Sequence, residues 1–121
     1  MKNFRFLDWK VYKDSKKLFN KVLFISNSLP KEYRFEISSQ LIRSGLSVVL
    51  NISEGSGKNS DRELNRFLDI SSGSLFEVLA IIDILRDNKF ISDDLSKEIM
   101  SDIHEISSQI GGLKKKIKST L

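Results

Sequence analysis

The stretch that decides the fold is residues 60–85, SDRELNRFLDISSGSLFEVLAIIDIL. Ser60 and Glu63 have the spacing of a capping box, which satisfies backbone N–H groups at the start of a helix. A helix is therefore expected to begin at Asp61. Along it, positions recur at alternating steps of four and three residues, the period of one helical face: Leu64, Leu68, Ser71, Leu75, Val78, Ile82 and Leu85. This row predicts a long helix with one side in a core.

A second apolar row lies beside the first on the same expected helix: Phe67, Ile70, Ile81 and Ile84. Together the rows are wider than the apolar stripe that a helix needs to face one core, so burial on two sides is expected. One copy of a small bundle covers only one of these sides. The second row therefore predicts that the protein associates with itself as a homo-oligomer.

Two helices are expected before this stretch. The first runs from Asp8, as its N-cap, to about Ser28, because Pro30 ends the pattern. The second runs from about Tyr33 to Glu54, with Gly55 at the C′ position. One face of the first helix is apolar: Val11, Tyr12, Leu18, Phe19, Val22, Leu23 and Leu29.

A last helix is expected after a turn near Asn88 and Lys89, with Ser92 or Asp93 as its cap. Its apolar positions form a seam for packing against neighbours: Leu95, Ile99, Ile103, Ile106, Ile110, Leu113 and Ile117. Gly111 and Gly112 weaken a helix at this point, which predicts a bend or a close approach of two backbones.

The fold class that follows is all-α, an up-down-up-down antiparallel four-helix bundle formed by residues 1–121 as a single domain. The 121 residues are 40% hydrophobic and 30% charged, a balance typical of a globular chain. No apolar run approaches the roughly 18 residues that cross a bilayer, so no membrane partner is expected. With no cysteine and no recognisable export signal, the expected location is cytoplasmic.

Catalytic chemistry has little support in the side chains available. The chain has one histidine, His104, and no cysteine, and its carboxylates are scattered over helix faces. Glu54 and Glu77 could form a carboxylate pair, but without a third ligand the favoured interpretation is structural hydrogen bonding. We therefore expect no enzyme, no catalytic residue, no metal site and no cofactor.

A polar row crosses the otherwise apolar second helix. Burial would oblige its members to find hydrogen-bond partners, and Asn51 and Glu54 in particular are expected to be buried and bonded. The alternative is a solvated stripe. The residues assigned to this structural polar motif are Gln40, Arg43, Ser47, Asn51, Glu54 and, on the third helix, Glu77.

These residues closely resemble a bacterial four-helix-bundle family encoded by intervening sequences in large-subunit ribosomal RNA genes, which includes the accessory variability protein of diversity-generating retroelements. The resemblance implies a homopentamer without known catalytic activity and, in the retroelement branch, binding to nucleic acid and reverse transcriptase. Ser53, Ser44-Gly45 and Lys58 depart from the common pattern and leave the branch open. The resemblance rests on Gln40, Arg43, Ser47, Asn51-Ile52, Glu54-Gly55, Ser60, Glu63, Phe67-Leu68, Gly73-Ser74-Leu75 and Glu77, with Leu7-Asp8-Trp9, Leu29-Pro30 and Gly112-Leu113 outside them.

Positive charge gathers at both ends of the chain, which carries a formal net charge of +4. The candidate nucleic-acid-binding residues are Lys10, Lys13, Lys17 and Lys21 on one face of the first helix, with Lys114, Lys115, Lys116 and Lys118 as a second cluster. Such lysines could contact phosphates, and repetition around an oligomer would multiply the contact. The alternative is an ordinary solvated face.

The function that fits best is a nonenzymatic, homo-oligomeric accessory protein that binds structured RNA or DNA, or associates with RNA, mainly through its basic surface. No base-specific motif is present, so recognition of shape and charge is expected. The alternative is a pentameric protein-interaction scaffold, for example for a reverse transcriptase, without direct nucleic-acid contact.

Overall fold

The computed structural model describes residues 4–119, with side chains through Ile117. Within that range the chain forms a short 3-10 helix, η1 (Arg5–Asp8), and four α-helices, and contains no strand. The α-helices are α1 (Lys10–Ser28), α2 (Lys31–Ser56), α3 (Asp61–Asp87) and α4 (Asp93–Ser119).

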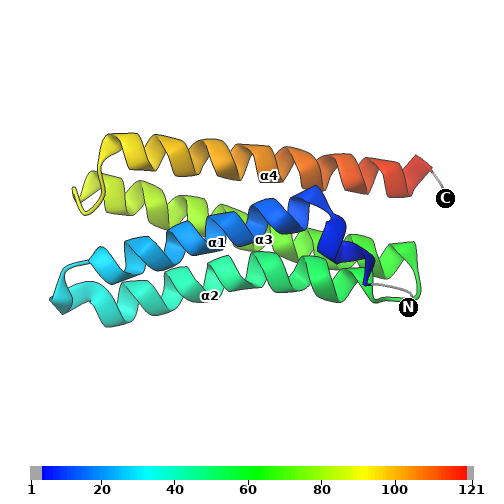
Figure 1. Cartoon of the computed structure of the whole chain (residues 1–121), viewed down its shortest axis with the longest axis horizontal. Helices are drawn as coiled ribbons and strands as arrows, with labels where there is room; N and C mark the ends of the chain where they lie inside the picture. The colour runs from blue at the N-terminus through cyan, green and yellow to red at the C-terminus, as the bar shows by residue number, and fades with distance from the viewer. Residues whose placement is uncertain (1–3, 120–121) are drawn as a thin grey trace.

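Each helix runs antiparallel to the next along the chain (Figure 1). Consecutive helices pack together, and α4 closes the bundle against α1. The α2–α3 contact is the most extensive in the bundle, and the α1–α4 contact is the smallest between helices of the bundle. The prediction of an all-α, up-down-up-down four-helix bundle is confirmed.

The predicted starts of the last two helices are correct, and side-chain caps explain both. The Glu63 backbone N–H donates to Ser60 Oγ over 3.1 Å, so α3 begins at Asp61. The Leu95 backbone N–H donates to Ser92 Oγ over 3.1 Å, which makes Ser92, rather than Asp93, the cap of α4. In both places a hydroxyl satisfies an N–H that has no partner within the helix.

The first helix begins later than predicted. Asp8 is not its N-cap, because the preceding residues form η1 and Asp8 ends that turn. Trp9 takes the N-cap position without a side-chain hydrogen bond. The second helix begins two residues before Tyr33, at Lys31, directly after Pro30.

Gly55 is not a C′ residue, because α2 continues to Ser56 and Gly57 follows it as the C-cap. Gly55 is instead required where α2 meets α3. A Cβ at this position would stand 2.8 Å from Phe67 Cβ and 3.1 Å from Leu64 Cδ1. Gly111 and Gly112 lie within the unbroken α4 helix, and a Cβ at either would meet nothing within 4 Å, so no close backbone approach occurs there.

The core runs along the bundle axis and contains the whole alternating row of α3, including the fully buried Ser71. From α4 it takes Ile99, Ile103, Ile106, Ile110 and Ile117, while Leu95 and Leu113 are partly buried. On α1 the prediction is correct for most positions, but Leu23 is exposed.

The second apolar row of α3 is only partly covered within one copy of the chain. Phe67 is buried and Ile81 is partly buried. Ile70 is 40% exposed and Ile84 is 55% exposed. Two isoleucines of α3 therefore remain accessible to a partner.

Candidate nucleic-acid interface

Of the four lysines predicted as one stripe on α1, Lys10 and Lys21 lie on the α4 flank, Lys13 lies on the α2 flank, and Lys17 lines a pocket on each. On the α4 flank, Lys10 Nζ pairs with Asp14 Oδ2 at 2.7 Å. Lys21 Nζ lies 3.0 Å from Glu98 Oε2 and 2.5 Å from Asp102 Oδ2, and so joins α1 to α4. Two members of the predicted stripe are thus neutralised by carboxylates of the same chain.

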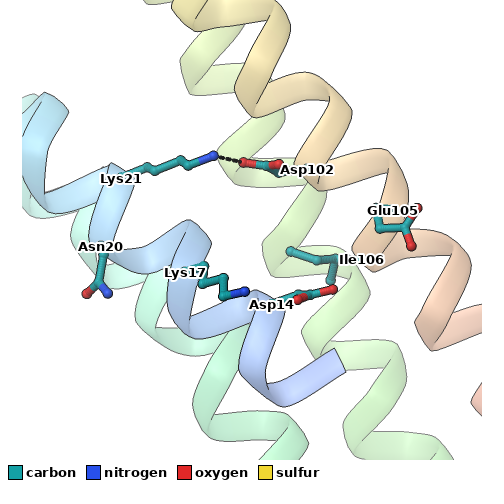
Figure 2. Close-up of a pocket in the computed structure, with 7 residues that line it drawn as sticks. All are labelled: Asp14, Lys17, Asn20, Lys21, Asp102, Glu105 and Ile106. Atoms are coloured by element: carbon teal, nitrogen blue, oxygen red, sulfur yellow. Dashed lines mark hydrogen bonds and ion pairs between the residues drawn. The ribbon is translucent and has the colours of Figure 1, made fainter. Parts of the chain in front are cut away.

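On the α4 flank of α1 lies a pocket of about 490 Å³, which is lined by both positively and negatively charged side chains (Figure 2). Asp14, Asp102 and Glu105 line it together with Lys17 and Lys21. Gln109 Nε2 donates to Asp14 Oδ2 over 2.8 Å, and this bond and the bond from Lys10 hold the pKa of Asp14 below its ordinary value. Hydrogen bonds to Asp102 and Glu98 raise the pKa of Lys21. The mixture of charges favours a structural clamp over an anion site.

The α2 flank of α1 has a different charge. Lys13, Lys16 and Lys17 line a groove of about 710 Å³ whose described lining includes no carboxylate. Its apolar part comes from Tyr12, Phe19, Leu46, Val49 and Leu50. We call this surface the lysine groove.

Lys16 was missing from the predicted stripe, although it belongs to the lysine groove. Its Nζ lies 4.8 Å from the centroid of the Tyr12 ring, a cation–π distance. On a helical projection Lys16 falls beside Tyr12, away from Lys10 and Lys21, so grouping the lysines by one face excluded it.

The C-terminal cluster is also divided. Lys114 pairs with Asp69 of α3, so it turns toward α3. Lys115 and Lys116 are exposed on α4, and the side chain of Lys118 lies outside the described residues.

Most of the polar row of α2 faces α3 and is hydrogen-bonded. Gln40 Nε2 donates to Glu77 Oε2. Ser47 and Ser74 share a hydroxyl hydrogen bond of 2.7 Å. Asn51 Nδ2 donates to the Ser47 carbonyl over 2.9 Å and to Ser47 Oγ over 3.0 Å. We call these residues the polar ladder: the Gln40–Glu77 and Ser47–Ser74 hydrogen bonds join α2 to α3, Asn51 bonds within α2, and Gln40 and Glu77 are exposed rather than buried.

Arg43 and Glu54 do not belong to this ladder. Both are exposed, and neither has a side-chain hydrogen bond or ion pair within the described residues, which corrects the expectation of a buried, bonded Glu54. Glu54 does not pair with Glu77, because Glu77 lies opposite Gln40. Gly55, the neighbour of Glu54, packs against Phe67 instead. Phe67 precedes Glu77 by ten residues, which is about 15 Å along α3.

The family model described as "23S rRNA-intervening sequence protein" matches residues 7–112. The chain belongs to this family. A solved structure of a protein of unknown function from the S23 ribosomal protein family of Bacteroides thetaiotaomicron shares the fold, with a TM-score of 0.81 and 23% identity, over 87% of this chain and 98% of that one. No curated protein matches the chain.

The match to the 23S rRNA-intervening sequence family includes the α1 lysines and the polar ladder, but it ends before Lys114. His104 is exposed on α4, and the described residues contain no group of three or more metal-ligating side chains. No described helix is long and apolar enough to cross a membrane.

The polar ladder gives a prediction about stability in this 23S rRNA-intervening sequence protein. Asn51→Ala should lower the free energy of unfolding by about 1 kcal/mol, because it removes two hydrogen bonds at a partly buried site. Glu54→Ala is the matched control on the same helix and should change it by less than about 0.5 kcal/mol. Urea unfolding followed by circular dichroism measures both, and equal losses would contradict the assignment.

Proposed function

We propose that this 23S rRNA-intervening sequence protein is a nonenzymatic, homo-oligomeric accessory protein that binds structured RNA or DNA mainly through its basic surface. The observation that carries the proposal is the lysine groove, where Lys13, Lys16 and Lys17 gather without a carboxylate among the described lining residues. On the other flank of the same helix, Lys10 pairs with Asp14, and Lys21 pairs with Glu98 and Asp102. Lys13 and Lys16 therefore carry charge without a carboxylate partner on the α2 flank of α1, and Lys17 lies between the two flanks.

Phosphate contact is the chemistry that this groove supports. Lysine ammonium groups neutralise phosphates and release condensed counterions, which favours binding at low salt and carries little sequence information. Recognition would follow the shape and charge of the nucleic acid. Lys115 and Lys116, near the C-terminal end of α4, would add contacts to an extended strand or a folded RNA.

Self-association is the second part of the proposal, with a homopentamer as the assembly. Ile70 and Ile84 provide the support, since they leave apolar surface on the outer side of α3. Repetition of the lysine groove around a symmetry axis would convert weak phosphate contacts into multivalent binding. We propose a cytoplasmic location, where RNA is accessible.

The competing proposal is a pentameric scaffold for another protein, for example the reverse transcriptase of a retroelement, without nucleic-acid contact. Phe24 and Phe76 support it, because both are large, exposed aromatic side chains on outer helix faces. Aromatic residues are enriched in protein interfaces. Nucleic-acid binding at low salt separates the two proposals.

The oligomer proposal predicts a particle of about five times the 13.9 kDa subunit mass in light scattering at micromolar concentration. Ile84→Glu should dissociate it, because a charge would be buried at the interface of α3. Phe24→Glu is the control, an equally drastic change at an exposed side chain on α1. A monomeric wild-type protein would contradict the proposal.

The nucleic-acid proposal predicts steep salt dependence in filter binding to a structured RNA. Affinity should fall by orders of magnitude between about 50 and 200 mM salt, and Lys13→Glu/Lys17→Glu should weaken binding and flatten this slope. Arg62→Glu/Lys97→Glu is the control, because it makes the same change in net charge at exposed sites on α3 and α4.

Two results would count against this proposal. An equal loss of RNA affinity in the Lys13→Glu/Lys17→Glu variant and in the control would exclude the lysine groove as the nucleic-acid-binding site. No binding to RNA or DNA at low salt would favour the protein scaffold.

A further inference from the structure

A second groove of about 840 Å³ lies between α1 and α2 toward Pro30. It adjoins the lysine groove, since Leu46 lines both. We call it the Phe35 groove. Its lining comes from Ser26 and Asn27 of α1 and from Lys31, Arg34, Phe35, Ser38, Ser39, Ile42, Arg43 and Leu46 of α2.

Three cations line the Phe35 groove, and its described lining includes no carboxylate. Lys31 and Arg43 form no ion pair within the described residues. Arg34 donates through Nε and Nη2 to the Leu29 carbonyl, over 3.2 and 3.1 Å, so its guanidinium is held at the groove with Nη1 left to donate. An arginine held in this way is suited to a phosphate.

The groove also contains a buried hydroxyl without a partner. Ser26 is only 3% exposed, and its Oγ has no hydrogen bond. Its own carbonyl accepts a hydrogen bond from Ser38 Oγ over 3.2 Å, which ties the two walls of the groove together. This bond fixes the wall of the groove, and the buried Ser26 Oγ offers no accessible donor to a ligand.

Phe35 gives the groove an aromatic surface. It is 82% exposed, the highest value among the exposed large hydrophobic side chains that the structure describes. Ile42 and Leu46 supply apolar surface beside it. An uncovered ring next to unpaired cations suits a ligand that combines a planar ring with negative charge, because nucleobases stack on such rings.

We propose that the Phe35 groove binds a nucleotide, with the phosphate at Arg34, Arg43 and Lys31 and the base stacked on Phe35. The nucleotide is either free or the end of a nucleic-acid strand, since both present the same chemistry. This site is separate from the lysine groove and does not depend on the proposed function.

The test is calorimetric titration of the full chain with adenosine 5′-monophosphate at low salt. Phe35→Ala and Arg43→Gln should each weaken binding by about tenfold or more. Two variants serve as matched controls. Phe24→Ala removes an exposed aromatic ring from α1, outside the Phe35 groove, and Lys17→Gln removes a charge from the lysine groove. Both variants should bind adenosine 5′-monophosphate like the wild type. Adenosine and inorganic phosphate should each bind more weakly than the nucleotide.

Competition identifies the source of the nucleotide. Displacement of adenosine 5′-monophosphate by a 5′-phosphorylated RNA oligonucleotide, and not by the unphosphorylated one, indicates a strand end. Displacement only by other free nucleotides indicates a free ligand. Absence of nucleotide binding, or equal weakening by Lys17→Gln and Arg43→Gln, would overturn the proposal, whatever the salt dependence of RNA binding at the lysine groove.

Discussion

The backbone of α2 at Gly55 lies so close to α3 that an added Cβ would stand 2.8 Å from Phe67 Cβ. Small side chains continue this close contact toward the middle of both helices. Ser71 Oγ donates to the Val48 carbonyl over 2.8 Å, and Ser47 bonds to Ser74. The α2–α3 pair therefore forms a dense unit, and the position of α1 and its two grooves depends on the α2 surface that this unit fixes.

The two flanks of α1 differ in charge as well as in the extent of packing. Toward α4 the contact is smaller and is supplemented by ion pairs, as in the bridge from Lys21 to Asp102. These ion pairs neutralise Lys10 and Lys21, two of the four lysines that the sequence predicts as a binding stripe. Toward α2 the packing is apolar, and Lys13 and Lys16 at its edge form no ion pair within the described residues, so both can contact other partners. The division explains how one helix both closes the bundle and presents two basic grooves.

Much of the fold could be predicted because burial on one side imposes a helical period, and the α3 row from Leu64 to Leu85 obeys it. Helix ends were harder, since the η1 turn before Trp9 and the role of Gly55 depend on packing. The candidate site was the hardest part to predict from the sequence. Lys21 and Asp102 are separated by 81 residues, and the Phe35 groove needs Ser26 of α1 opposite Ser38 of α2. Such neighbours appear only once the helices are placed.

The most direct measurement of the central claim compares the unfolding free energies of Gly55→Ala and Gly112→Ala. Alanine favours a helix over glycine by about 1 kcal/mol, so Gly112→Ala, in open space on α4, should stabilise the protein. Gly55→Ala should destabilise it by about 1–3 kcal/mol, because the added methyl group collides with Phe67. Stabilisation by both substitutions would contradict the claim that close α2–α3 packing fixes the structure.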